Sequence, residues 1–175
     1  MMKKITILLI AFCTYYNVNA TISNEYSVLA EDSVNVEHSD TILEHSLPYP
    51  CIGKMSIVEH FGEKEVPNLQ DTKVNNKGVV LNTEKESTVH SVHNGIVSAV
   101  FVFADKYAII VRHGEFLSVY SGMEQVSVKK GQKVSELQPL GNMGANQYLN
   151  FQWRKGTKAL NPEDWFQNDS YSNNF

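Results

Sequence analysis

Apolar runs that are dense in β-branched and aromatic residues, separated by turn residues, dominate the middle of the chain. Residues 96–104 read Ile-Val-Ser-Ala-Val-Phe-Val-Phe-Ala, a composition that favours a strand. Asn94-Gly95 precedes this run and Asp105-Lys106 follows it, which predicts a tight turn at each end. Further strands are expected at residues 107–111 and 116–120. Short turns would then link three consecutive strands into an antiparallel meander.

Shorter strands are predicted on both sides of this meander, at residues 54–59, 78–81, 138–140 and 148–154. No segment shows a long helical repeat, although residues 162–166 can form one helical turn. The pattern therefore predicts an all-β fold: a single antiparallel β-sandwich or barrel-sandwich domain with very little helix.

The first twenty residues have the features of an export signal. Met1 to Lys4 is basic, residues 5–13 form an apolar run, and Val18-Asn19-Ala20 supplies small residues before a cleavage site. The run is too short to cross a bilayer. We therefore expect a signal peptide over residues 1–20, cleaved after Ala20, and a periplasmic or extracellular protein. The alternative is a lipoprotein signal acylated at Cys13, which would anchor the protein to a membrane.

The mature chain divides into a tether, a domain and a tail. Residues 21–46 are rich in Ser, Asn, Glu and Asp and predict a flexible tether, and the polar residues 167–175 predict a disordered tail. The domain is expected over residues 47–166. Cleavage removes two of 15 basic groups and none of 19 acidic groups, so the net charge falls from −4 to −6. This charge disfavours nonspecific binding to nucleic acid. Cys51 is left without a disulfide partner, and its apolar neighbours favour a packing role.

Several segments between residues 47 and 166 carry a family resemblance through their order and spacing. They are Leu-Pro-Tyr-Pro at 47–50, Asn-Lys-Gly-Val-Val at 76–80, Val-Arg-His-Gly at 111–114, Val-Lys-Lys-Gly-Gln-Lys-Val at 128–134, Gln-Pro-Leu-Gly at 138–141, and the segments 149–154 and 160–165. Together they resemble the LytM-domain, or lysostaphin-like, zinc endopeptidases of bacterial cell walls and their inactive relatives. The β architecture that this resemblance implies agrees with the strand pattern.

The resemblance also identifies the positions where an active member would hold zinc. There, a His and an Asp from a His-x-Gly-x-Asp segment and the second His of a His-x-His bind the metal and leave one position open for water. In this chain Asn76, Val80 and Asn150 stand at those positions, and Gly122 and Tyr148 stand where two supporting His residues would be. Valine has no lone pair to donate, and carboxamides bind transition metals weakly. The sequence therefore predicts no metal, no cofactor and no catalytic residue, so that the protein is not an enzyme.

The other His residues of the expected domain offer no replacement ligand set. His90 and His93 are three residues apart in a region that reads as strand, where such positions point to opposite faces. His113 lies in an expected hairpin turn and is interpreted as structural, and His60 is interpreted as a solvated residue at a strand end.

The resemblance implies functions that do not need catalysis. Inactive relatives of the EnvC and NlpD types bind and switch on cell-wall amidases, so we expect a regulator of peptidoglycan remodelling or cell separation. Its partner would be a cell-wall amidase or another murein hydrolase, held in the vestigial active-site groove. The floor of that groove would be lined by Asn76, Val80, Gly122, Tyr148 and Asn150.

Other interpretations of the same residues stay open. The groove can instead bind the stem peptides of peptidoglycan, or its residues can simply fill the vacated space. An active zinc endopeptidase with unexpected ligands is a further alternative. Arg154, Lys155 and Lys158 form either a basic cluster for an acidic partner or a solvated turn.

Overall fold

The structure is a computed structural model that describes residues 46–65 and 73–167. These residues belong to the second of the two units into which the chain divides, Glu37–Phe175. The expected signal peptide, most of the tether and most of the tail lie outside the described residues. No helix in the described ranges has the length and the hydrophobicity to cross a bilayer.

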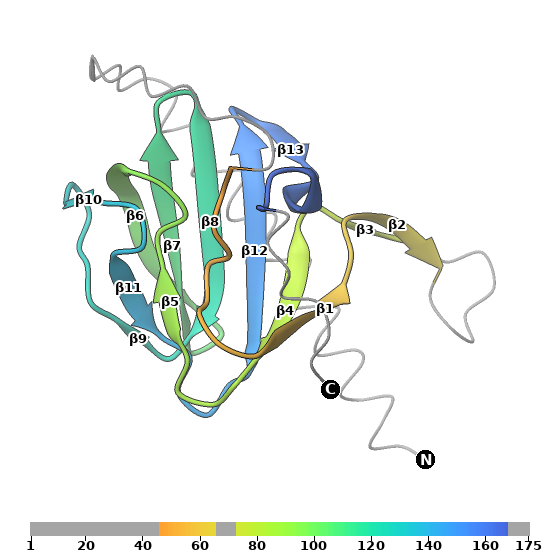
Figure 1. The fold of residues 1–175 in the computed structure, drawn as a ribbon, viewed down its shortest axis with the longest axis horizontal. Coiled ribbons are helices and arrows are strands. Elements are labelled where there is room, and N and C mark those ends of the chain that lie inside the picture. Colours follow the sequence, from red (N-terminus) through yellow and green to blue (C-terminus); the bar gives the residue numbers. More distant parts are fainter. Residues whose placement is uncertain (1–45, 66–72, 168–175) are drawn as a thin grey trace. The chain divides into compact units, whose positions relative to one another are not determined.

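Eight antiparallel strands form the main sheet (Figure 1), in the order β1-β4-β12-β8-β7-β6-β10, with β13 beside β12. Their bounds are Met55–Glu59 (β1), Val79–Thr83 (β4), Tyr148–Lys155 (β12), Phe116–Met123 (β8), Lys106–His113 (β7), Gly95–Phe103 (β6), Lys133–Val134 (β10) and Lys158–Leu160 (β13).

Two smaller sheets accompany the main sheet. One has the order β5-β11-β9, with bounds Thr88–His90, Pro139–Asn142 and Gln125–Val126, and the other pairs β2, Gly62–Glu65, with β3, Lys73–Asn76. The described helix is a single 3-10 turn, η1, at Pro162–Asp164. The predicted all-β, antiparallel fold with very little helix is therefore confirmed.

The predicted meander is formed by β6, β7 and β8. Its first turn lies one residue earlier than the sequence predicted, at Ala104-Asp105. Both residues have positive φ, 47° and 61°, as in the primed turns that match the twist of a hairpin. Lys106 instead begins β7, where it pairs with Phe103 across the turn. Its Nζ lies 2.7 Å from Glu124 Oε1.

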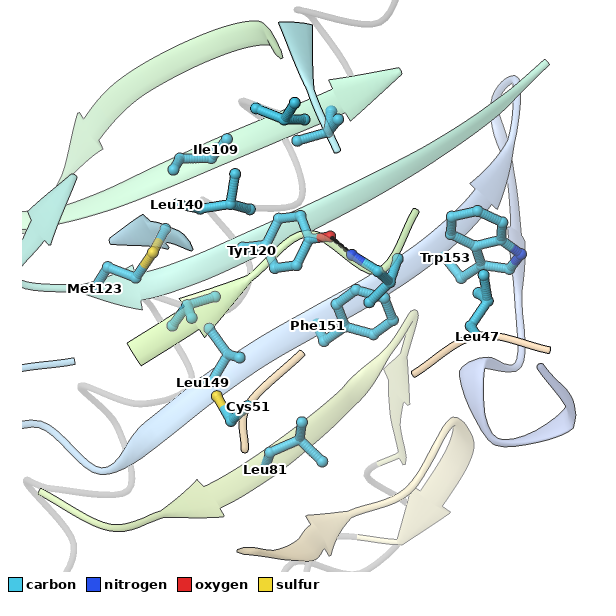
Figure 2. Packing of buried hydrophobic residues seen from close by; sticks show 14 of the residues in the cluster. Leu47, Cys51, Leu81, Ile109, Tyr120, Met123, Leu140, Leu149, Phe151 and Trp153 are labelled. Carbon is cyan, nitrogen blue, oxygen red and sulfur yellow. Dashed lines mark hydrogen bonds between the residues drawn. The ribbon is translucent and has the colours of Figure 1, made fainter. Parts of the chain in front are cut away.

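The core lies against the inner face of the main sheet, where large side chains of β8 and β12 meet Leu140 of β11 (Figure 2). Tyr120, Phe151 and Trp153 are fully buried there. The hydroxyl oxygen of Tyr120 accepts a hydrogen bond from the backbone N–H of Val92 at 3.0 Å, which satisfies the polar end of this buried side chain.

Cys51 belongs to the same core and is 2% exposed. Burial raises the pKa of its thiol to about 12, so the thiol stays protonated at neutral pH. Because the thiolate is the reactive form, this environment supports the packing role predicted from the sequence.

The two ends of the described chain are hydrogen-bonded to each other. Leu47 donates its N–H to Trp165 O at 2.9 Å, and Gln167 donates to Leu47 O at 2.8 Å. The rings of Tyr49 and Phe166 stack with their centroids 4.3 Å apart. These contacts attach the segment before β1 to the end of the folded region.

Candidate functional site

The outer face of the main sheet carries two of the three positions that the sequence assigned to zinc ligands. Val80 of β4 lies directly opposite Asn150 of β12, and Asn150 lies opposite Ser121 of β8. Residues opposite each other in antiparallel strands project to the same face. Because Val79 and Leu81 on either side of Val80 are fully buried in the core, Val80 itself projects away from it.

Asn150 has an unsatisfied acceptor on this face. Its Oδ1 atom is buried and has no hydrogen-bond partner among the described residues. Buried acceptors without partners are uncommon in folded proteins and cost stability. This oxygen is therefore available to an N–H or O–H donor of a bound molecule.

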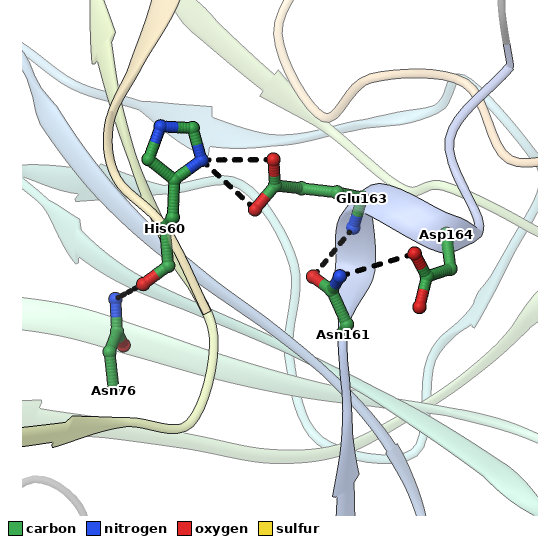
Figure 3. Close-up of polar contacts among 5 residues, drawn as sticks. All are labelled: His60, Asn76, Asn161, Glu163 and Asp164. Carbon is green, nitrogen blue, oxygen red and sulfur yellow. Dashed lines mark hydrogen bonds and ion pairs between the residues drawn. The ribbon is translucent and has the colours of Figure 1, made fainter. Parts of the chain in front are cut away.

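Asn76 is the third position that the sequence assigned to a zinc ligand. Its side-chain amide is hydrogen-bonded to backbone groups. Asn76 is fully buried at the end of β3, where its Oδ1 accepts from Gly78 N–H at 3.1 Å. Its Nδ2 donates to His60 O at 3.0 Å (Figure 3). The first bond closes the turn into β4, and the second attaches that turn to the junction of β1 and β2. Asn side chains often bond the backbone N–H two residues on, as in Asx turns, so the residue type at position 76 was compatible with this role.

His60 takes part in the same junction. Its Nδ1 lies 2.9 and 3.1 Å from the two carboxylate oxygens of Glu163 in η1, although its side chain is 70% exposed. Asn161 caps η1 by accepting from Glu163 N–H at 3.2 Å (Figure 3). The ring is solvated as predicted, but the sequence did not reveal its partner, which lies 103 residues away.

Gly122 and Tyr148, the two supporting positions, meet at the end of β8. Gly122 has φ +105°, and a Cβ placed on it would lie 2.6 Å from Tyr148 O. No side chain fits there without a backbone shift, so this backbone cannot present a His at position 122. Tyr148 begins β12, and its side chain is 57% exposed.

The side chains at these positions do not fit zinc. The row that crosses the outer face through Asn150 consists of Glu59, Val80, Asn150, Ser121, Ala108 and Phe101. It contains no imidazole, and the carboxylate of Glu59 lies 3.0 Å from Lys64 Nζ. Within residues 46–65 and 73–167, no three His, Cys, Asp or Glu side chains are grouped so that they could hold a metal ion. The row instead contains the amide of Asn150, the hydroxyl of Ser121 and the apolar side chains of Val80, Ala108 and Phe101. Such groups suit contacts with a bound molecule better than coordination of a metal ion.

The remaining His residues of the described ranges form no metal-ligand set. His113 is 5% exposed; its Nδ1–H donates to Asn94 O at 2.8 Å, and its Nε2 accepts from Ser118 Oγ at 2.7 Å. Burial lowers its pKa to about 4, so the ring is neutral at pH 7. These contacts support the predicted structural role, although His113 ends β7 instead of lying in the hairpin turn. The strand expected over His90 and His93 ends at His90, the last residue of β5, and His93 lies in the bend before β6. The ring of His93 contacts that of His113 edge-on, with the centroids 6.0 Å apart.

Of the three basic residues considered at 154–158, only Arg154 is buried, whereas Lys155 and Lys158 flank the exposed turn between β12 and β13. Arg154 is 5% exposed and donates to Gln152 Oε1 at 3.0 Å and to Thr157 O. Lys155 pairs with Glu115 at 2.9 Å. The sequence interpretation was wrong for Arg154 because this residue lies opposite Ala159 of β13, which the pattern did not predict as a strand.

Known proteins share both the sequence and the fold of this region. An uncharacterized protein of Neisseria meningitidis serogroup B, NMB1333, is 33% identical over 101 residues, which cover 52% of this chain and 16% of that protein. Csd3 of Helicobacter pylori has a TM-score of 0.61 and 25% identity, with 69% of this chain and 34% of Csd3 covered. The chain thus spans only a small part of each of these relatives.

Two further solved structures share the fold at lower identity. A chain of the SpoIIQ-SpoIIIAH pore-forming complex has a TM-score of 0.59 and 22% identity, with 74% of this chain and 99% of that chain covered. A zinc-containing peptidase of Vibrio cholerae has a TM-score of 0.60 and 21% identity, with 67% and 39% covered. The sequence model of peptidase family M23 matches residues 74–162, from β3 to the start of η1, which is just over half of the 175 residues. The chain therefore belongs to peptidase family M23.

Proposed function

We propose that this protein is an exported, non-catalytic member of the M23 family that binds a cell-wall amidase and raises its activity during peptidoglycan remodelling or cell separation. The binding surface is the outer-face site, which we define as Val80, Gly122, Tyr148 and Asn150. The observation that carries the proposal is that Val80 lies directly opposite Asn150. The pair offers an aliphatic side chain and an amide at positions where a zinc ion would need strong donor atoms.

The chemistry of this site supports a non-catalytic role. A hydrolytic zinc needs three protein ligands to polarise its water. Val80 supplies no donor atom, and both polar ends of the Asn76 amide are hydrogen-bonded to backbone. Asn150 would remain as a single weak ligand, which cannot hold zinc in water.

The same site has features that suit a protein partner. The ring of Tyr148 is more than half exposed and can act as an aromatic anchor, the type of residue that dominates interface energies. Asn150 Oδ1 can accept a hydrogen bond that the described part of the chain does not provide. A fold relative occurs in the SpoIIQ-SpoIIIAH complex, which supports a protein as the partner. The export signal at residues 1–20 would bring the protein to the compartment where amidases act.

An amidase assay tests the proposal directly. Purified mature protein is added to a purified amidase from the same cell, and release of peptide from sacculi is measured with wild type, Tyr148→Ala and Leu137→Ala. Leu137 is the matched control because it is an apolar residue of similar exposure, 45%, in the loop between β10 and β11. We expect stimulation by wild type and by Leu137→Ala, and a loss of at least about tenfold in apparent affinity for Tyr148→Ala.

Other outcomes of the assay would identify the competing functions. If the protein neither stimulates nor co-purifies with the amidase but sediments with sacculi alone, the site binds stem peptides and the proposal is wrong. Stoichiometric zinc in the purified protein, together with cleaved stem peptides in the absence of an amidase, would show an active endopeptidase.

A further inference from the structure

The loop that joins β11 to β12, residues 143–147, leads directly into the outer-face site. It ends at Tyr148, the first residue of β12 and the exposed aromatic residue of that site. Met143 is fully buried in the core, and Gly144 O accepts a hydrogen bond from Glu86 N–H at 2.7 Å. The loop is therefore attached to the rest of the fold at its first two residues.

Glu124, which follows β8, holds the next part of the loop. Gly144 has φ +58°, and a Cβ placed on it would overlap the carboxylate of Glu124, so this carboxylate packs directly against the loop. The hydrogen bond from Lys106 makes the largest contribution to lowering the pKa of the Glu124 carboxyl. The backbone N–H groups of Ala145 and Asn146 lower this pKa further by donating to the same carboxylate. Glu124 thus ties the loop to the end of β8.

Gly122 of β8 lies where regular strand pairing stops. The register between β7 and β8 shifts at Gly122, which has no partner residue in that ladder. The ladder between β8 and β12 ends at Ser121 and Asn150. Bulges of this kind end pairing and change the direction of a strand. The carbonyl oxygen of Gly122 is therefore left for a donor from outside these two ladders.

The side chain of Asn146 supplies this donor. Its Nδ2 donates to Gly122 O at 2.7 Å and to Tyr148 O at 3.1 Å. Its Oδ1 accepts from Tyr148 N–H at 3.4 Å. One carboxamide thus joins the end of β8 to both backbone polar groups of the first residue of β12. Because Gly122 and Tyr148 both belong to the outer-face site, these bonds fix part of the site itself.

We propose that Asn146 is a positioning residue of the outer-face site, which holds the backbone of Tyr148 against Gly122 so that the exposed ring is presented to a partner in a fixed place. The inference rests on the proposed function, because Tyr148 is the expected anchor for the amidase. A preorganised anchor binds more tightly, since less conformational freedom is lost when the complex forms. Without Asn146, the start of β12 would have to become ordered on binding.

Titration of a purified amidase with the mature protein tests this role through two quantities, the apparent affinity and the stimulation at saturation. Asn146→Ala should weaken the apparent affinity by about tenfold. It should leave the stimulation at saturation as in wild type, because the ring of Tyr148 is still present. Asn146→Asp should lose at least as much affinity, although it keeps the size of the side chain, because an oxygen then replaces the Nδ2 donor next to Gly122 O.

Gln147→Ala is the matched control. This neighbouring residue carries the same carboxamide group and is also partly buried, but its Nε2 donates to Thr83 O of β4 at 3.3 Å. We expect its apparent affinity to stay within about twofold of wild type. Thermal unfolding of all three variants shows whether the fold is retained.

Amide hydrogen exchange of the protein alone tests the same contact without an amidase. In Asn146→Ala the N–H of Tyr148 loses its bond to the Asn146 side chain. The amides of Tyr148 and Leu149 should then exchange faster relative to the amide of the buried Tyr120, whereas Gln147→Ala should leave this ratio as in wild type.

Three results would overturn the proposal: an unchanged apparent affinity in Asn146→Ala, equal losses of affinity in Asn146→Ala and Gln147→Ala, or unchanged exchange at Tyr148 and Leu149. A wild-type protein that does not stimulate the amidase would instead refute the proposed function. The exchange measurement would then decide alone whether Asn146 holds the start of β12, since it needs no partner.

Discussion

Strand β12 presents two faces that differ in chemistry although they share one backbone. On the inner face, Leu149, Phe151 and Trp153 are fully buried in the core. On the outer face, Tyr148 is mostly exposed and Asn150 has a buried oxygen without a partner among the described residues. The comparison teaches that the inner face of β12 supplies side chains to the core, whereas the outer face carries, at Tyr148 and Asn150, groups that a bound molecule can contact.

The largest loss of stability is expected from a substitution on the inner face of β12. Phe151→Ala removes a fully buried ring that lies 5.3 Å from Tyr120 and 5.5 Å from Phe166, measured between centroids. We expect the free energy of unfolding to fall by about 3–5 kcal/mol, from lost burial and from the cavity that remains. Urea unfolding followed by circular dichroism measures this change. A loss below about 1 kcal/mol would show that the inner face is not the main source of stability.

The second largest effect is expected from acid, which should lower the stability of the fold through the buried ring of His113. Its pKa falls from 6.5 to about 4 in the folded state, mainly because burial disfavours the charged ring, and His93 nearby acts in the same direction. Between these two pH values the unfolded chain binds more protons than the folded chain, so stability decreases as the pH falls through this window. The pKa difference corresponds to about 3 kcal/mol once the pH is below 4.

Unfolding midpoints measured from pH 7 to pH 4 test this prediction. His113→Gln should be less stable at pH 7, because it loses the bonds to Asn94 and Ser118, but its stability should depend less on pH. An unchanged pH slope in this variant would assign the acid sensitivity to other groups. Burial also lowers the pKa of His90, which adds a contribution of the same sign.

The inner face is also the part that the sequence predicted well. Runs such as residues 96–104 identify strands because they are dense in β-branched and aromatic residues and are bounded by turn residues. β2 and β3 were missed because Gly-Glu-Lys-Glu and Lys-Val-Asn-Asn show no apolar alternation. The sequence predicted the turn at Asp105-Lys106, one residue later than its observed place at Ala104-Asp105, because the residue types are compatible with a turn at either pair.

The outer face could be predicted only in part. The family resemblance pointed to Val80 and Asn150, and the strand register places them side by side. The His60–Glu163 pair and the bond from Asn76 to His60 O join residues 103 and 16 positions apart. Such contacts depend on tertiary packing, and no local pattern encodes them.

A smaller effect is expected at Asn76, where a residue at a zinc position has a structural role. Asn76→Ala removes two hydrogen bonds and leaves Gly78 N–H and His60 O without these partners. We expect a loss of about 1–3 kcal/mol, the usual cost of leaving buried polar groups unpaired. Asn82→Ala is the matched control, since Asn82 lies on β4 and is only partly buried. Equal losses in the two variants would contradict the role assigned to Asn76.

The smallest change in stability is expected at Asn150, where the contrast between the two faces is sharpest. Asn150→Ala deletes an acceptor that has no partner among the described residues, so the free energy of unfolding should stay within about 0.5 kcal/mol of wild type or rise slightly. If the outer-face site binds an amidase, the same variant should stimulate that amidase less. Phe151→Ala should behave in the opposite way. Its free energy of unfolding should fall, but at temperatures where it remains folded it should stimulate the amidase as much per molecule as wild type does. Parallel losses of stability and stimulation in both variants would mean that the two faces of β12 do not divide folding from binding.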